Sequence, residues 1–213
     1  AMTFDSFKNK HQGDTFIVCG CGKSAGNVPS QLPPAIKTIG VNDISRLFDP
    51  NYLVVVNPRS QFKGDRFQYI EQTKSEAVFT QLDLGIAHPN VIRFKLGQRG
   101  GTDFANPNVL HYTRNSPYVA VCLAIHLGAS RIGLIGVDFT DHHFFAETGR
   151  HTLANDLARI DEEYGELSLA CQRLGIEFVN LSRESKLTKV SKGELDQFLR
   201  NCPEKPPKAA KKL

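Results

Sequence analysis

Buried strands and helix-forming segments alternate along most of this chain. Short runs that are rich in apolar and β-branched residues predict strands, and seven such runs occur. They span residues 15–20, 37–43, 52–57, 76–82, 91–96, 131–139 and 176–182. The segments between them carry a helical period or turn-forming residues, so they are expected to connect the strands across the faces of a sheet.

The helix signals differ in strength. The strongest is the segment in which Ser116 fits an N-cap, Pro117 the first helical position and Gly128 a stop. Weaker patterns predict helical segments over 43–50, 60–74, 152–175 and 191–201. Residues 97–115 are rich in glycine and asparagine, and they are expected to form a loop.

This alternation predicts an α/β fold, a doubly wound and mostly parallel sheet with helices on both faces. A length of 213 residues suits one such domain. We expect the domain to span residues 15–200, with an N-terminal extension over 1–14 and a disordered basic tail over 201–213.

Charge and apolar content narrow the class of function. The net charge is +4, of which four lysines and one glutamate in the tail supply +3, leaving +1 for the body. A nearly neutral body does not indicate a basic surface that would bind nucleic acid, so no such partner is expected. The longest apolar run is too short to span a bilayer. The tail is compatible with a solvated segment or with peripheral association at an inner membrane, and a homo-oligomer stays open.

The five cysteines lack the spacing of a disulfide framework. Cys19 and Cys122 lie inside apolar runs, which favours core residues in a reducing cytoplasm. The pair Cys19 and Cys21 has no second cysteine pair to complete a zinc site.

Ligand chemistry in such a sheet is expected beyond the carboxyl ends of its strands. The first strand leads into a glycine-rich loop, Gly20 to Gly26. Glycines there let a ligand approach the backbone, whose N–H groups bind phosphate. The loop is neither a Walker loop nor a GxGxxG motif, so a plain tight turn explains it equally well.

Polar residues also lie at the ends of other predicted strands and at the start of a predicted helix. Asn42 and Asn57 each close a strand, where an amide suits a ribose or a base edge, although turn chemistry explains either one alone. Asn115 and Ser116 stand at a helix N-terminus, which attracts anions. Asp138 follows a buried strand at the same edge and is expected to contact a ligand there.

The sequence "VCGCGKSAGNVPSQL" is followed in order by "IGVNDISRLFDPNYLVVVNPRSQF", "NSPYVAVCLAIHLGASRIGLIGVDF" and "GRHTLANDLARIDEEYGELSLACQRLGIEFVNLS". Over residues 15–185 this order of motifs resembles the bacterial sialyltransferases of glycosyltransferase family 42. It also resembles the related 6-hydroxymethylpterin diphosphokinase-like group, which includes motility-associated flagellin glycosyltransferases. The resemblance implies a modified Rossmann-like sheet that binds CMP-sialic acid.

The resemblance also implies roles for individual residues. The first loop would face the nucleotide phosphate and ribose, through Gly20, Cys21, Gly22, Lys23 and Ser24. The strand-end and helix-start residues Asn42, Asn57, Asn115 and Ser116 would contact nucleotide and sugar, and a pocket for cytidine or sugar would be lined by Gly136, Asp138 and Phe139. His151 fits the place of the general base.

Two departures from the sialyltransferase pattern bear on the leaving group. Cys21 stands where those enzymes carry an asparagine. Thr140 follows the Asp-Phe pair, where they carry tyrosines that hold the leaving phosphate, so His142 and His143 become candidate donors.

The resemblance therefore predicts a cytoplasmic glycosyltransferase that moves a sugar from a nucleotide-activated, CMP-linked donor to a hydroxyl of a glycan or another acceptor. It implies no obligatory cofactor and no resident metal. One alternative is a diphosphokinase-like pyrophosphotransferase that uses Mg²⁺ and ATP, with Asp138 and Asp141 as metal ligands. Another is a non-catalytic nucleotide-binding module. A zinc hydrolase built on the histidines is disfavoured, because adjacent His142 and His143 diverge and no metal-ligand spacing occurs.

Overall fold

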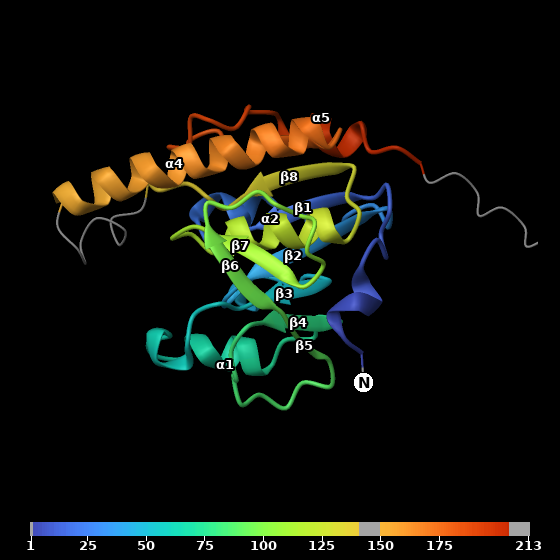
Figure 1. Cartoon of the computed structure of the whole chain (residues 1–213), viewed down its shortest axis with the longest axis vertical. Coiled ribbons are helices and arrows are strands. Elements are labelled where there is room, and N and C mark those ends of the chain that lie inside the picture. The colour runs from blue at the N-terminus through green and yellow to red at the C-terminus, as the bar shows by residue number, and fades with distance from the viewer. Residues whose placement is uncertain (1, 141–149, 205–213) are drawn as a thin grey trace, which may run out of the picture.

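The computed structural model describes residues 2–140 and 150–204, and only the backbone of residues 150–154. Its centre is a seven-stranded sheet in the order β5-β4-β3-β2-β1-β8-β9, with every neighbouring pair parallel (Figure 1). The strands are β1 (Thr15–Cys19), β2 (Ile36–Val41), β3 (Tyr52–Val54), β4 (Ala77–Thr80), β5 (Val91–Arg93), β8 (Arg131–Ile135) and β9 (Glu177–Asn180). The predicted α/β, doubly wound class is confirmed.

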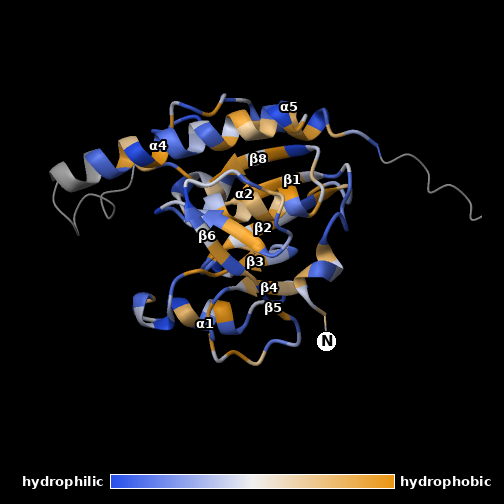
Figure 2. Cartoon of the chain, viewed as in Figure 1, coloured by the Kyte–Doolittle hydropathy of each residue, from blue (hydrophilic) through white to orange (hydrophobic). Residues whose placement is uncertain are grey.

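Helices cover both faces of this sheet. They are α1 (Arg66–Glu71), α2 (Pro117–His126), α4 (Arg150–Arg173) and α5 (Leu195–Arg200), with short 3-10 turns η1 (Phe4–Phe7), η2 (Lys23–Asn27), η3 (Ile44–Arg46) and η4 (Arg59–Gln61). Figure 2 shows hydrophobic residues concentrated in the strands and in α2, while α4 alternates between hydrophobic and hydrophilic faces. The chain is thus a three-layer α/β unit.

The strands pack on both faces because their side chains alternate. In β1, Phe16 and Val18 point into the cluster that contains α2 and α4, whereas Ile17 and Cys19 point into the cluster that contains α1 and α5. All four are fully buried. This is why β1 has no polar face, as is typical of a central parallel strand.

Two predictions for the middle of the chain are wrong. The run over 91–96 is not one strand, because the chain leaves the main sheet after β5 and begins β6 (Lys95–Arg99) in a separate sheet. The loop expected over 97–115 contains the end of β6 and all of β7 (Val109–Tyr112), which pairs with β6 in parallel. Only tertiary pairing reveals β6, since its side chains are mostly exposed and follow no apolar period.

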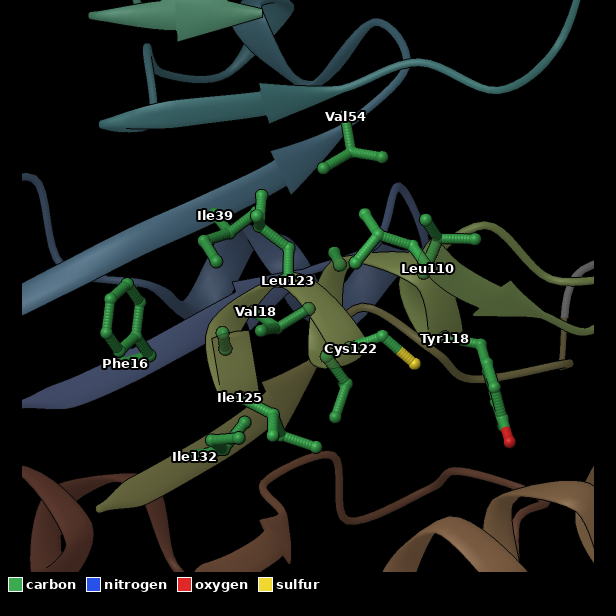
Figure 3. Close-up of a cluster of buried hydrophobic side chains, with 14 of the residues drawn as sticks. Phe16, Val18, Ile39, Val54, Leu110, Tyr118, Cys122, Leu123, Ile125 and Ile132 are labelled. Carbon is green, nitrogen blue, oxygen red and sulfur yellow. The ribbon is translucent and has the colours of Figure 1, made fainter. Parts of the chain in front are cut away.

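Helix α2 is buried all round, and Figure 3 shows it lying across the strands of the sheet. The predicted helix is confirmed, and Ser116 occupies the predicted N-cap position, but its side chain does not cap the helix. Ser116 already has helical backbone angles, φ −57° and ψ −33°, and its side chain makes no capping hydrogen bond. A capping residue needs an extended backbone, which Ser116 lacks.

The N-terminal residues pack on the same face as α2. Phe4 and Phe7 are buried, and their rings make edge contacts with Phe79 at centroid distances of 5.9 and 5.1 Å. Further along, Tyr52 Oη lies 2.6 Å from His11 Nε2, and His11 Nδ1 lies 3.3 Å from Asp14 Oδ2. Residues 4–14 therefore cover the face of β3 and β4.

We expect His11 to make the stability of the protein depend on pH. Burial, followed by Lys37 and Lys10, lowers the pKa of His11 below 6.5, although Asp14 opposes the shift. The unfolded chain then binds more protons than the native one, so stability is full above pH 6.5 and falls as the pH drops toward the lower native pKa. We expect the melting temperature to fall less between pH 7 and pH 5 in His11→Gln than in the wild type. Equal falls in both proteins would contradict this origin.

Helix α4 is much longer than the strands on which it packs. Its 24 residues span about 36 Å, whereas the five residues of β8 span about 17 Å. Figure 1 shows its first turns projecting past the carboxyl ends of the strands. Among the described residues, no helix combines the length and the apolarity that crossing a bilayer requires.

Candidate functional site

The strand order places a topological switch point at the carboxyl edge of the sheet. From β1 the chain moves outward through β2 to β5, and it then returns to the other side of β1 to form β8 and β9. The connections after β1 and β8 therefore diverge, which makes the space between them the topological switch point, where ligands bind in such sheets. The glycine loop and the segment from Gly136 to Phe139 both begin there.

The glycine loop packs tightly against the exit of β8. The Gly20 N–H donates to Ile135 O, and the Gly22 N–H donates to Gly136 O, both at 2.8 Å. A Cβ on Gly20 would lie 2.5 Å from Gly136 O, and one on Gly22 would lie 2.6 Å from the same oxygen. Both positions therefore require glycine because two backbone segments meet, whatever ligand approaches.

A hydrogen-bond tie joins Ser24 to Asp138. The Ser24 N–H donates to Asp138 Oδ2 at 2.8 Å, and Ser24 Oγ donates to Oδ1 at 2.6 Å. Ser24 Oγ also accepts from the Gly136 N–H at 2.8 Å and lies 2.7 Å from Ser182 Oγ. Asp138 is only 7% exposed, so its carboxylate holds the loop in shape. This leaves both of its oxygens engaged, which disfavours the Mg²⁺ ligand of the diphosphokinase alternative.

Ser182 was not predicted from the sequence. It lies two residues beyond β9, and it also accepts from the Gly136 N–H at 3.3 Å. Strand ends marked the other site residues, and the same rule applied to the last strand would have found this one.

The backbone is strained at two non-glycine positions of this edge. Asn42 and Phe139 both have φ of 56°, in the left-handed region. Asparagine tolerates that region, whereas phenylalanine adopts it rarely. Phe139 is buried directly after Asp138, and strain of this kind concentrates at functional sites.

Asn42 offers an unused hydrogen-bond acceptor. Its backbone N–H donates to Val54 O at 3.1 Å, but its Oδ1 is buried and has no partner among the described residues. A buried polar atom without a partner is rare in proteins, so a ligand hydroxyl or N–H is a natural partner for it. Asn57 lies three residues beyond β3, half-buried on the next strand of the same edge.

The start of α2 reaches the glycine loop. A Cβ on Gly20 would also lie 2.9 Å from Pro117 Cγ. Asn115 Oδ1 accepts a hydrogen bond from Tyr164 Oη at 2.7 Å, which joins α2 to α4, and Ser116 is half-buried beside it. The structure thus brings the predicted residues of β1, β8 and α2 together, with Asn115 in a structural role.

A hollow of about 290 Å³ lies beside the loop. It is lined by Cys21, Gly22, Lys23 and Gly26 from the loop and by Asp43, Ile44, Arg46 and Leu47 from the turn after β2. Asp43 is held by Arg66, whose Nη2 and Nε donate to its oxygens at 2.9 and 3.2 Å. The lining carries two cations, Lys23 and Arg46, and one carboxylate, and Arg46 also pairs with Asp65 at 3.2 Å.

The Cys21 thiol faces this hollow as a neutral group. Its Sγ donates to Val41 O at 3.3 Å. Although Cys21 is exposed as a whole residue, its thiol is largely surrounded by protein, and this burial, together with the Asp43 carboxylate, raises the thiol pKa to about 12. Within the described part of the chain, no three His, Cys, Asp or Glu side chains are grouped as metal ligands.

The remaining predicted residues lie at the start of α4 or just before it. Thr140 is exposed at the end of the described segment, and His142 and His143 lie outside the described residues, as do residues 205–213 of the basic tail. His151 is the second residue of α4, in its projecting first turn, and its side chain lies outside the description.

Comparison with solved structures supports the fold of this edge. The chain is similar to the MAf glycosyltransferase from Magnetospirillum magneticum AMB-1, with a TM-score of 0.54 and 12% identity over 90% of this chain. The chain spans 37% of that protein's length. Weaker similarities are to the sialyltransferase CstII (TM-score 0.47, 15% identity, 84% of this chain and 85% of that one) and an alpha-2,3-sialyltransferase (0.45, 13%, 88% and 86%), both from Campylobacter jejuni. No family model and no curated protein matches. The chain thus shares the fold of part of the MAf glycosyltransferase.

Proposed function

We propose that this chain is a glycosyltransferase domain that uses a nucleotide-activated sugar, with a CMP-linked donor as the first choice. One observation carries the proposal: the motifs that resemble those of bacterial sialyltransferases meet at the switch point of the sheet, where Ser24 and Asp138 join the two loops. The similarity in fold to a MAf glycosyltransferase supports it.

The donor would lie at the carboxyl edge of the sheet, beside the glycine loop and the hollow that the loop forms with the turn after β2. The backbone of the glycine loop faces its phosphate, and the buried Oδ1 of Asn42 accepts from a hydroxyl of the ribose or the sugar. Asn57 and Ser116 complete the sugar side. Phe139, held in a strained conformation, lines the base or sugar pocket. Asp138 contributes indirectly, because its carboxylate keeps the loop in its binding shape.

The reaction would be a direct displacement at the anomeric carbon of the sugar. The acceptor hydroxyl loses its proton to His151 as its oxygen bonds to that carbon, while the bond from the carbon to the phosphate oxygen breaks and CMP departs. Imidazole suits this step because its ordinary pKa lies near working pH. Donors around the phosphate stabilise the leaving group, and His142 and His143 are the proposed ones.

A thermal-shift panel of nucleotides, each with and without Mg²⁺, tests the proposal. We expect CMP at 100 times its dissociation constant to add about 2.7 kcal/mol of stability, a rise of about 5–10 °C in melting temperature, without any metal. A CMP-sugar in the presence of a hydroxyl acceptor should then release CMP.

The other outcomes separate the alternatives. Stabilisation by ATP only with Mg²⁺ would favour the pyrophosphotransferase and contradict the proposal. Nucleotide binding without turnover of any CMP-sugar, and without loss on changing His151, would instead identify a binding module.

A further inference from the structure

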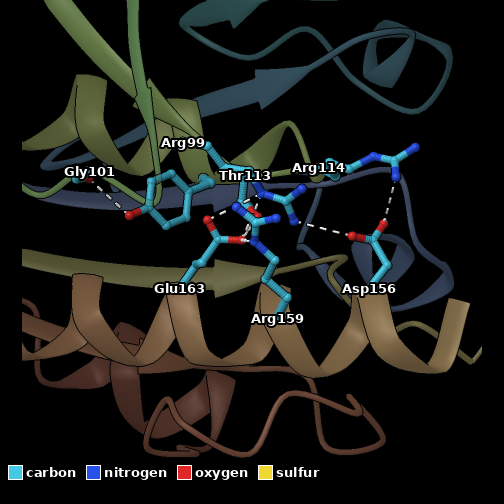
Figure 4. A network of polar contacts seen from close by, with 8 residues as sticks. Arg99, Gly101, Thr113, Arg114, Asp156, Arg159 and Glu163 are labelled. Atoms are coloured by element: carbon cyan, nitrogen blue, oxygen red, sulfur yellow. Dashed lines mark hydrogen bonds and ion pairs between the residues drawn. The ribbon is translucent and has the colours of Figure 1, made fainter. Parts of the chain in front are cut away.

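A largely buried arginine joins the small β6–β7 sheet to helix α4. Arg99 ends β6, and its side chain is 16% exposed. Its Nε donates to the two carboxylate oxygens of Glu163 at 2.9 and 3.3 Å, and its Nη2 donates to Asp156 Oδ1 at 3.2 Å (Figure 4). Asp156 and Glu163 lie two turns apart on α4, so one planar guanidinium binds carboxylates on two different turns of the helix. We call these contacts of Arg99 with Asp156 and Glu163 the grip.

Other residues around the grip also contact Glu163 and Asp156. Thr113 Oγ1 donates to Glu163 Oε1 at 3.2 Å. Gly100 has φ of 69°, and a Cβ there would lie 2.5 Å from Glu163 Oε2, so only glycine lets the strand end approach the carboxylate. Arg114, mostly exposed, adds an ion pair of 3.4 Å to Asp156. The hydrogen bonds of Arg99 with Glu163 and Asp156 join charged groups, and such bonds are stronger than those between neutral groups.

The grip acts on the part of α4 that projects beyond the sheet. Asp156 lies five residues after His151, and the turns between them extend past the strand ends (Figure 1). From Leu157 onward the helix is also fixed by apolar packing, through Leu157, Ile160, Tyr164 and Leu167. Among the α4 side chains that the structure describes, Asp156 is therefore the anchored one nearest to the first turn, and Arg99 is what holds it.

We propose that Arg99 is a positioning residue, which fixes the position of the first turn of α4, where His151 lies. This inference rests on the proposed function, since it assigns the helix start a part in the reaction. A displacement of about 1 Å at a reacting group costs on the order of a hundredfold in rate, so the loss of the grip should act on turnover. It should leave donor binding at β1 and β8 unchanged.

The test compares two neighbouring glutamates on the same helix. Glu163→Gln removes the charge that Arg99 grips, whereas Glu162→Gln removes one partner of an exposed pair with Lys189, 3.4 Å away. We expect Glu163→Gln to lower kcat roughly 10- to 100-fold while the KM for the CMP-sugar changes less than about twofold. Glu162→Gln should match the wild type. Arg99→Lys keeps the positive charge but loses the planar guanidinium, so its kcat should lie between those of the two glutamate variants.

Hydrogen exchange of the peptide over residues 155–163 gives a second, activity-free readout. Exchange there should be roughly tenfold faster in Glu163→Gln and in Arg99→Lys than in Glu162→Gln, with β1 and β8 unchanged. If Glu163→Gln does not fold, Arg99→Lys decides both readouts. Folded variants with wild-type kcat and wild-type exchange would overturn the proposal. If the wild type transfers no sugar, the proposed function fails, and with it the role in turnover, while the exchange data still decide whether Arg99 holds the helix.

Discussion

His151→Ala should abolish most sugar transfer while leaving nucleotide binding intact. Removing a general base slows a reaction by roughly 10²- to 10⁴-fold, and we expect a loss of that size in kcat. The thermal shift produced by CMP should stay within about 1 °C of the wild type, because His151 is not among the proposed contacts to the nucleotide. Single-turnover release of CMP from a CMP-sugar measures the first effect.

Asn155→Ala is the matched control for this experiment. Asn155 is exposed one turn further along α4, so the change alters the same helix without touching the proposed base. Wild-type turnover in Asn155→Ala with wild-type turnover in His151→Ala would remove His151 from the mechanism. The pH profile adds a check, since kcat/KM of the wild type should decline at acid pH as its base is protonated.

Gly22→Ala should damage both the stability of the protein and its nucleotide site. The new Cβ would lie 2.6 Å from Gly136 O and 2.7 Å from Asp138 Oδ2, so it forces apart the two segments that Ser24 ties together. Overpacking of this kind costs about 1–3 kcal/mol, which corresponds to a fall of roughly 2–12 °C in the melting temperature. The stabilisation by CMP should also be lost.

Gly26→Ala tests whether that loss comes from the close approach. Gly26 lies in the same loop, but a Cβ there would meet nothing within 4 Å among the described residues. The melting temperature of Gly26→Ala should therefore stay within about 2 °C of the wild type. If both glycine variants melted alike, the contact between the loop and the exit of β8 would not be what makes Gly22 necessary.

The main sheet could be predicted from sequence because its strands are buried on both sides. Residues 15–20 and 131–139 are mostly apolar and β-branched, and this composition is typical of strands that are buried on both faces. The β6–β7 pair carries no such mark. Residues 95–99 are mostly exposed and polar, and they form a strand only because Val109 to Tyr112 lie beside them in the folded chain.

The position of the candidate residues at one edge of the sheet could be predicted from the sequence, but the hydrogen bonds among them could not. Asn42, Asn57 and Asp138 stood out as polar residues that end strands. The bond between Ser24 and Asp138 joins residues 114 positions apart, and Arg99 grips Glu163 across 64 positions. No local pattern encodes such pairs, since they depend on how the strands are ordered and where α4 crosses them.

The tie at Ser24 also determines when the loop loses its conformational freedom. Three hydrogen bonds within the protein hold Ser24 and Gly136 in place, and none of them involves a ligand atom. The entropy of ordering this loop is therefore lost when the protein folds, and little of it is left to oppose nucleotide binding. A site built in this way is preorganised, so its affinity reports the contacts themselves, and Ser24→Ala would transfer part of the ordering cost from folding to binding.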